Sequence, residues 1–288
     1  MDKCRAGSVR APNQPARSET DSMTETPDRH DFALDLIVSA GRLAMDYFAR
    51  LATLETESKK DGQDVVSAAD RAVEDLIRDA IHAVFPSDGI LGEERSHEPG
   101  TSGWLWVVDP IDGTSCVLAG LRDWCISIAA MKDGEADSGC ILQPVTGDLY
   151  AARRGGGATL NGAPILASAT ARIETNLLGF GANFRIPRQS VIAFADALMA
   201  SGGMFYRNGS GALMLAYVAA GRLCGYYEGH INAWDCMAGL LLVREAGGWT
   251  MPFPGPGREL TEGGPVLCGP AHLEHDLLAL AVRAGHWT

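Results

Sequence analysis

The sequence predicts an α+β fold, and three observations support this. Two amphipathic helical patterns open the chain, one over residues 30–51 and one that ends at Phe85-Pro86. Short apolar runs separated by turn residues follow over about 104–152, which is typical of a mainly antiparallel sheet. Beyond about residue 170, strand-like and helical runs alternate, so a second layered region is expected there.

Apolar residues three and four positions apart predict both N-terminal helices. In the first helix they form one stripe, made of Leu36, Ile37, Ala40, Leu43, Ala44, Tyr47, Phe48 and Leu51. The series from Val73 to Val84 repeats the pattern and stops where Pro86 cannot continue a helix. Asp70 is expected at or just before the first turn of this second helix.

A sheet is predicted from the runs that follow. Trp104–Val108 is fully apolar and predicts a strand that ends in the acidic segment Asp109–Thr114. Further strands are expected at residues 126–131, 139–142 and 148–152, with turns at residues 132–134 and 144–147. Asp109 and Asp112 are therefore expected at the carboxyl end of a strand.

The second half is predicted to alternate strands and helices. The expected strands are 177–180 and 223–228, and the expected helices lie near 190–199, 213–220, 235–246 and 271–284. Gly247-Gly248 is a C-cap signal for the helix that starts at Asp235. We expect a domain boundary near residue 170. Residues 1–27 are expected to form a disordered tail that lacks the apolar run of a signal peptide, and Met23 is an alternative start.

Composition and charge restrict the class of protein. The chain of 288 residues is 46% hydrophobic and 21% charged, which excludes disordered, collagen-like and disulfide-stapled chains. A net charge of −12, without a basic run, makes nucleic acid and anionic membrane poor partners. Seven cysteines without a C-x-x-C pair favour a cytoplasmic location. Since every long apolar window contains a charge, no membrane-spanning helix is expected.

Acidic residues at four places are candidates for holding a cation: Glu93, Asp109 with Asp112, Asp70 and Asp235. Asp70 and Asp235 also fit helix N-caps, and Glu93 also fits a solvated loop. Asp109 and Asp112 favour function, because a buried strand delivers both acids to the rim of a sheet. Carboxylates suit hard divalent cations such as Mg²⁺, whereas the EF-hand and zinc-site patterns do not match.

Three ordered motifs make the chain similar to the inositol monophosphatase family. They are Gly92-Glu93-Glu94, Asp109-Pro-Ile-Asp-Gly-Thr114, and Trp234-Asp235 followed by Glu245-Ala-Gly-Gly248. The resemblance covers about residues 30–285. It implies a five-layered α-β-α-β-α sandwich of the inositol monophosphatase / fructose-1,6-bisphosphatase type, a homodimer, and a Mg²⁺-dependent phosphatase for small phosphorylated polyols. Residues 28–170 then form an α+β metal-binding domain, and residues 171–288 form an α/β domain that completes the active site.

The resemblance also implies two or three Mg²⁺ ions, with Mn²⁺ as an alternative. Its ligand sets, carried over by position, are Glu93, Asp109, the Ile111 carbonyl and Thr114 for one ion, Asp109, Asp112 and Asp235 for a second, and Asp70 with Glu93 for a third. Physical chemistry agrees with this assignment. Converging carboxylates without cations would repel one another and raise each other's pKa, and divalent charge offsets that repulsion.

The implied reaction is the in-line attack of a metal-activated water on phosphorus. Glu93, Thr114 and Asp70 are expected to act on the water. The phosphate is expected beside Asp112, Asp235 and the backbone N–H groups of Gly113 and Thr114. The resemblance places Ser210, Gly211, Ala212 and Glu228 on the hydroxyl side of the substrate. The ordinary alternatives are a helix N-cap for Ser210-Gly211-Ala212 and a strand-end acid for Glu228.

Substrate identity is left open by the sequence. Ser115-Cys116-Val117 replaces a common Thr-Asn-Phe, and Gly120–Trp124 resembles relatives acting on histidinol phosphate as much as those acting on inositol phosphate. We expect hydrolysis of inositol monophosphate to inositol and phosphate. The alternatives within the superfamily are histidinol phosphate, fructose 1,6-bisphosphate and 3′-phosphoadenosine phosphates. The alternative from another class is a non-catalytic regulatory protein in which the same acids hold metal ions without turnover.

Overall fold

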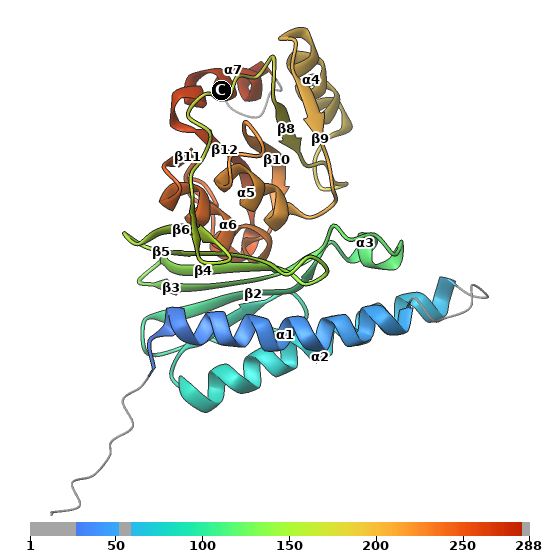
Figure 1. Cartoon of the computed structure of the whole chain (residues 1–288), viewed down its shortest axis with the longest axis vertical. Coiled ribbons are helices and arrows are strands. Elements are labelled where there is room, and N and C mark those ends of the chain that lie inside the picture. The colour runs from blue at the N-terminus through green and yellow to red at the C-terminus, as the bar shows by residue number, and fades with distance from the viewer. Residues whose placement is uncertain (1–26, 52–58, 284–288) are drawn as a thin grey trace, which may run out of the picture.

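The structure is a computed structural model that describes residues 27–51 and 59–283, with side chains in the second helix described from Val66 onward. The expected disordered tail, apart from Pro27, and the alternative start at Met23 lie outside the described residues. Helices and sheets alternate in five layers (Figure 1). This stacking confirms the predicted α+β fold and its α-β-α-β-α order.

Two long helices, α1 (Arg29–Leu51) and α2 (Lys59–Val84), form the first layer. The first agrees with prediction, but the second begins well before the expected start. Its buried stripe already includes Val66 and Ala69, each 1% exposed, among polar residues that hid the helical period. Asp70 therefore lies inside a helix, and both its expected position at the first turn and its N-cap alternative are wrong.

A seven-stranded sheet, with its strands in chain order, covers these helices. Only its first pair is parallel, and the other neighbours are antiparallel as predicted. Three short strands, the first, sixth and seventh, were not predicted, because none exceeds four residues. The strands are β1 (Gly89–Gly92), β2 (Trp104–Asp112), β3 (Cys125–Lys132), β4 (Glu135–Gln143), β5 (Asp148–Arg153), β6 (Gly157–Leu160) and β7 (Ala163–Ile165).

The strand β2 does not end at Val108, as predicted, but runs on through the acidic segment. Asp109 pairs with Ser127 and Asp112 pairs with Cys125, and the register shifts between these two pairs. Pro110, which has no N–H to donate to the ladder, lies within this irregularity. Asp109 and Asp112 are therefore held by strand pairing at the carboxyl end of β2, in the interior of the strand order.

The second half contains the helices and strands that alternate in the sequence pattern. The helices are α4 (Arg188–Ala200), α5 (Gly211–Ala219), α6 (Ala233–Glu245) and α7 (Glu274–Arg283). A five-stranded sheet has the order β11-β12-β10-β8-β9, with β8 (Leu177–Phe180), β9 (Met204–Tyr206), β10 (Tyr226–Ile231), β11 (Gly248–Thr250) and β12 (Gly264–Pro270).

Several details of this half differ from prediction. The strand expected at 223–228 begins three residues later, at Tyr226, and the last helix begins at Glu274 after a 3₁₀ turn. The strands β9, β11 and β12 were missed, the first two because each has only three residues. Gly247 follows the C-cap of α6 with φ 78°, as the glycine pair predicted.

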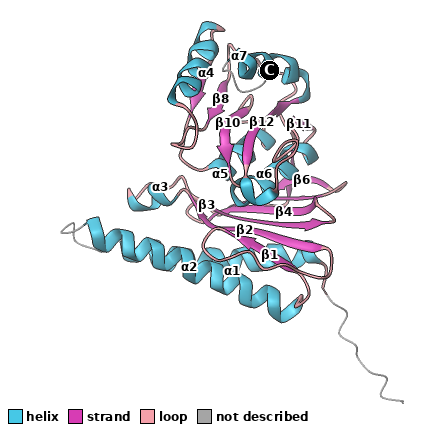
Figure 2. Cartoon of the chain, turned by 180° about the vertical axis from the view of Figure 1, so that it is seen from behind, coloured by secondary structure: helices cyan, strands magenta, loops and turns pink. Residues whose placement is uncertain are grey.

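Helices α5 and α6 form the middle layer between the two sheets (Figure 2). Because sheets cover them on both sides, these helices are apolar around most of their circumference. The cluster around them joins residues of both halves, for example Val107, Leu215 and Val266. The division at residue 170 thus stays a prediction. In the part of the chain that the structure describes, no helix has the length and apolar character needed to span a membrane.

Candidate metal centre and active site

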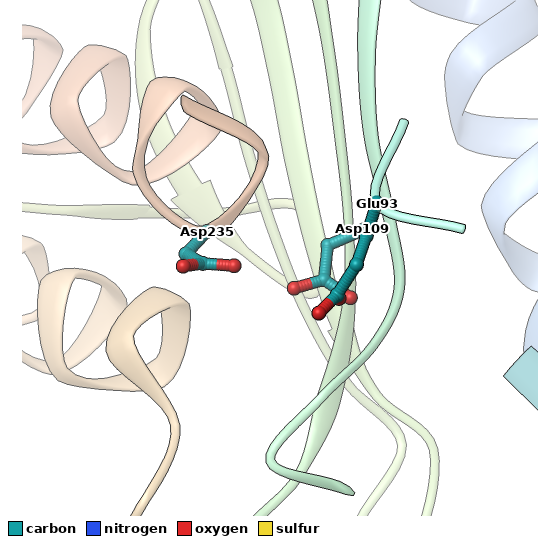
Figure 3. A group of neighbouring side chains, drawn as sticks. All are labelled: Glu93, Asp109 and Asp235. Carbon is teal, nitrogen blue, oxygen red and sulfur yellow. The ribbon is translucent and has the colours of Figure 1, made fainter. Parts of the chain in front are cut away.

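Three carboxylates from distant segments converge beside the carboxyl ends of β1 and β2. Glu93 follows β1, Asp109 lies in β2, and Asp235 lies in the first turn of α6. One carboxylate oxygen of each lies within 4.8 Å of the others. Figure 3 shows Asp235 reaching from the start of its helix toward Glu93 and Asp109. The predicted meeting of these acids in one pocket is therefore observed.

Asp235 owes its position to the way α6 begins. The N-cap residue is Asn232, so the N-cap alternative for Asp235 itself is wrong. Asp235 is the third helical residue, and its Oδ2 accepts hydrogen bonds from the Asn232 backbone N–H at 3.3 Å and from Asn232 Nδ2 at 3.4 Å. This capping box anchors the carboxyl group at the helix end that faces β2.

Asp109 is the most buried of the three acids, at 1% exposed. Its Oδ1 accepts a hydrogen bond from the Ile111 N–H at 2.9 Å. Its Oδ2 is buried and, among the described residues, has no hydrogen-bond partner. A buried carboxylate oxygen without a donor is unfavourable unless something outside the chain binds it. With two more carboxylates beside it, this oxygen fits a divalent cation.

The pKa values of Glu93, Asp109 and Asp235 are all raised, because burial is combined with negative charge that no neighbouring cation of the described chain balances. Burial and the nearby Asp112 carboxylate raise the pKa of Glu93 to about 7. Burial and neighbouring acids raise the pKa values of Asp109 and Asp235 well above the usual range. In the described parts of the chain, the ion pairs of Lys, Arg and His all involve other acids. The donor set therefore fits a hard cation better than it fits an unfilled pocket.

Asp112 lies beside the three acids but is held by another helix. Its Oδ2 accepts hydrogen bonds from the Ser210 hydroxyl at 2.6 Å and from the Ala212 N–H at 2.7 Å. Burial nevertheless raises its pKa to about 6. Ser210 is also the N-cap of α5, since its Oγ accepts from the Leu213 N–H at 3.2 Å. The N-cap alternative for this segment is thus correct. Ala212, which was expected on the hydroxyl side of the substrate, instead donates its N–H to Asp112.

Thr114 begins the short helix α3 (Thr114–Leu118) at the end of β2. Its hydroxyl donates to the Ile111 carbonyl at 3.3 Å, so these two predicted ligands touch each other. Gly113 has φ 101°, and a Cβ there would lie 2.8 Å from the Asp123 carbonyl oxygen. Only glycine fits this turn, which explains Gly113 in the motif.

Asp70 lies behind the other acids, within α2. It is 4% exposed, and burial together with Glu94 and Glu93 raises its pKa to about 8. It does not line the cavity described below. The Glu93 charge thus acts on Asp70, but Asp70 lies outside the group of three converging acids, and the third predicted ligand set stays a prediction.

A cavity of about 240 Å³ opens in front of the acids. Glu93, Asp109, Ile111, Asp112, Gly113, Thr114, Ser210, Gly211, Glu228 and Asp235 all line it, whereas Ala212 does not. Glu228 accepts hydrogen bonds from Asn183 Nδ2 at 2.8 Å and from the Tyr226 hydroxyl, and burial raises its pKa. The predicted residues are thus largely brought together, while their chemical roles stay predictions.

Sequence reasoning missed part of the cavity wall. The additional lining residues include Asn183, Arg185, Arg207, His230 and Asn232. They come from the segments around β8, β9 and β10, and none belongs to a recognisable motif. The one signal in the sequence was that Arg185 and Arg207 are cations in a strongly acidic chain.

Comparison with known proteins gives consistent relatives. The sequence matches the inositol monophosphatase family over residues 28–286. It is 38% identical to an inositol-1-monophosphatase of Rhizobium meliloti (86% of this chain, 93% of the relative). It is 36% identical to the Nus factor SuhB of Xylella fastidiosa (86% and 92%) and to a histidinol-phosphatase of Chlorobaculum parvum (80% and 87%). The structure of inositol monophosphatase from Anabaena superposes with a TM-score of 0.76 at 29% identity, covering 88% of this chain and 95% of that one.

Proposed function

The chain belongs to the inositol monophosphatase family and is a phosphatase, and from this premise we propose that it hydrolyses inositol monophosphate to inositol and phosphate. The observation that carries the proposal is the group formed by Glu93, Asp109 and Asp235 around the unpartnered Asp109 Oδ2. Such a group suits phosphate-ester chemistry, because a phosphate dianion approaches an acidic site only when cations lie between them.

The metal ions of this proposal are two or three Mg²⁺, with Mn²⁺ as the alternative. Glu93, Asp109, Asp112 and Asp235 would hold them, with the Ile111 carbonyl, Thr114 and Asp70 completing the ligand sets. When bound, such ions polarise the phosphoryl oxygens and lower the pKa of the attacking water.

The chain's own residues supply orientation and proton handling. Thr114 Oγ1, which lies at the end of β2, orients the attacking water for approach to phosphorus, with Glu93 and the buried Asp70 behind it. The backbone N–H groups of Gly113 and Thr114 bind phosphoryl oxygens. Because the main chain at Gly113 is held in a conformation that excludes a side chain, these donors keep their direction before substrate arrives.

The opposite wall of the cavity receives the alcohol part of the substrate. Glu228 lines this wall, and Asn183 and Tyr226 hold its carboxyl group in place. We assign Glu228 the role of accepting hydrogen bonds from substrate hydroxyls, with Ser210 and Gly211 lining the cavity beside it. Hydroxyl donors match a buried carboxylate well, so a polyol is favoured over an apolar alcohol.

Measurement of phosphate release tests this proposal. Purified protein is assayed with inositol 1-phosphate, histidinol phosphate, fructose 1,6-bisphosphate and 3′-phosphoadenosine 5′-phosphate, each with Mg²⁺ and with excess chelator. We expect Mg²⁺-dependent release, fastest from inositol 1-phosphate. Metal binding without release from any substrate would favour the regulatory alternative instead.

One observation favours a second candidate substrate, a sugar bisphosphate. Arg185 and Arg207 line the cavity, and in the described chain neither forms an ion pair with an acid. Arg185 Nη1 donates to Asn232 Oδ1 at 3.0 Å, and Arg207 Nη2 donates to the Ala182 carbonyl at 3.2 Å. Guanidinium groups bonded only to neutral acceptors suit a second anionic group and disfavour the ammonium of histidinol phosphate.

The arginines give this second candidate a direct test. Replacing both residues with glutamine keeps their length and removes their charge. If the bisphosphate is the substrate, kcat/KM for fructose 1,6-bisphosphate falls about tenfold or more, while kcat/KM for inositol 1-phosphate changes little. An equal effect on both substrates would contradict a dedicated site for a second phosphate.

We also propose a homodimer that functions in the cytoplasm. The location is drawn from the odd set of seven cysteines. For the dimer, β9 is an edge strand of the second sheet, and its Met204 and Phe205 are 62% and 44% exposed. Exposed apolar residues on a sheet edge are suited to pairing with a second copy. Light scattering of the wild type and of the Met204→Glu, Phe205→Glu variant tests this, with a change from dimer to monomer expected.

A further inference from the structure

Glu74 is a fully buried carboxylate that the proposed reaction does not use. It lies on α2 at 0% exposed and does not line the cavity. Its Oε2 accepts a hydrogen bond from the Glu94 N–H at 2.7 Å, and its Oε1 accepts from the Arg95 N–H at 3.1 Å. These two backbone donors directly follow Glu93. Glu74 therefore binds the main chain of the segment that carries one of the three converging acids.

The same face of α2 holds this segment at a second point. Asp70, Glu74, Arg78 and His82 are four residues apart and lie on one side of the helix. Arg78 donates to Glu74 Oε1 at 2.7 Å and to Glu98 Oε1 at 2.9 Å. The His82 ring is 2.8 Å from Glu98 Oε2. The connection between β1 and β2 is thus tied to α2 both just after Glu93 and at Glu98.

Gly92 is part of this arrangement. A Cβ at this position would overlap the Glu74 carboxyl group. The glycine of the Gly92-Glu93-Glu94 motif therefore allows Glu74 to approach the backbone closely enough to bind the next two N–H groups. Any larger residue would push the chain away from α2 and move Glu93 with it.

The charge of Glu74 makes a purely stabilising role hard to justify. A buried ion pair such as Glu74–Arg78 adds little net stability unless further hydrogen bonds satisfy it. In addition, the negative charge of Glu74 repels those of Asp70 and Glu93. An apolar residue would avoid both penalties. What an apolar residue lacks is an acceptor for the backbone N–H groups of Glu94 and Arg95.

We propose that Glu74, neutralised by Arg78, is a positioning residue that holds the backbone after Glu93 so that the Glu93 carboxylate stays beside Asp109 and Asp235. The proposal rests on the proposed metal-dependent function of the cavity. The Glu93 residue as a whole is solvent-exposed, although its carboxyl group is enclosed among the other acids, and those acids repel it. Released from Glu74, its side chain would turn toward water, and a metal ion would have to draw it back on binding.

The test compares Glu74→Gln with Asp75→Asn. Asp75 is the matched control, because it pairs with the Arg95 side chain at 2.7 Å and both groups are substantially exposed. It therefore contacts the same segment without binding its backbone. Metal-free full-length protein is titrated with Mn²⁺, and free Mn²⁺ is followed by electron paramagnetic resonance. We expect the Mn²⁺ dissociation constant to rise about 10- to 100-fold in Glu74→Gln and to change less than about twofold in Asp75→Asn.

Kinetics gives a second readout that a merely structural role would not produce. In Glu74→Gln the Mg²⁺ concentration for half-maximal phosphate release should rise, while kcat at saturating Mg²⁺ should stay within about threefold of wild type. If Glu74→Gln does not fold, the double variant Glu74→Gln, Arg78→Gln takes its place in the test, because it removes both charges of the buried ion pair together. A folded variant with wild-type Mn²⁺ affinity would overturn the positioning role. Wild-type protein that neither binds Mn²⁺ nor releases phosphate would instead overturn the proposed function.

Discussion

The Ser210 hydroxyl donates a 2.6 Å hydrogen bond to Asp112 Oδ2, joining the start of α5 to the end of β2 across 98 residues. The Ala212 N–H donates to the same oxygen. The protein itself therefore binds Asp112 Oδ2, and the start of α5 in the middle helical layer sets the direction of the Asp112 carboxyl group. The metal centre is therefore assembled by packing between layers as well as by the acidic motif of β2.

Replacing Ser210 with alanine should weaken both stability and activity. The change removes one donor to Asp112 and the N-cap of α5, so the free energy of unfolding should fall by about 1–2 kcal/mol. Activity should fall because Asp112 is no longer held by two donors. Ser201→Ala is the control, since Ser201 hydrogen-bonds only within the end of α4. Thermal unfolding and phosphate release measure the two effects, and unchanged activity in Ser210→Ala would argue that Asp112 needs no such support.

Asp109→Asn and Asp112→Asn should each abolish turnover while preserving the fold. For Asp109→Asn we also expect the metal-free protein to unfold at a higher temperature than wild type. A neutral amide keeps an acceptor for the Ile111 N–H, and it offers donors to the Glu93 and Asp235 carboxylates that repel Asp109 in the wild type. Differential scanning calorimetry with chelator, beside the phosphate-release assay, measures both outcomes. Full activity in either variant would refute the proposed ligand sets.

The fold and the acids were largely predictable, because the signals for them are local. Periodicity located α1, and a fully apolar run located β2. The successive residues Trp106 and Val107 of β2 face two different cores on opposite sides of the sheet. Asp109 and Asp235 lie next to a strand end and a helix start that the sequence predicts, and Glu93 was found through the Gly92-Glu93-Glu94 motif. The start of α2 was not predictable in the same way, because polar residues obscure its apolar stripe, and this is why Asp70 was misplaced.

The contacts between layers were beyond sequence reasoning for a different reason. That Ser210 would bind Asp112, and that Glu74 would bind the chain after Glu93, depends on how helices pack on the first sheet. No motif encodes such pairs. Arg185 and Arg207 reach the cavity from loops, where the side-chain period that marks strands and helices is absent.

Replacing Thr114 with valine should lower kcat with little effect on stability. Valine keeps the shape of the side chain and removes the hydroxyl that donates to the Ile111 carbonyl and is proposed to orient the attacking water. A fall in kcat of about 10²–10³-fold is expected, the range for losing one well-placed polar group. Thr114→Ser restores the hydroxyl and should recover most of the activity. A Thr114→Val enzyme with near-normal kcat would show that the hydroxyl takes no part in the reaction.

The stabilisation that Mg²⁺ confers should grow as pH rises from about 5 to about 8. Folding raises the pKa values of Asp112, Glu93 and Asp70 to about 6, 7 and 8, so the metal-free folded state binds more protons than the unfolded state. Its stability therefore falls as pH rises through this window, and the buried Asp70 and Asp112 contribute more to this fall than the solvent-exposed Glu93. Mg²⁺ favours the ionised acids and opposes this loss.

The measurement is the difference in unfolding temperature between protein with saturating Mg²⁺ and protein with chelator, taken at each pH. Groups outside the metal centre, such as His30 and Asp88 with their lowered pKa values, titrate alike in both samples and cancel. Asp109→Asn serves as the matched control, because it should bind Mg²⁺ poorly and give a small difference at every pH. A wild-type difference that stays constant from pH 5 to pH 8 would mean that the cation does not bind at these acids.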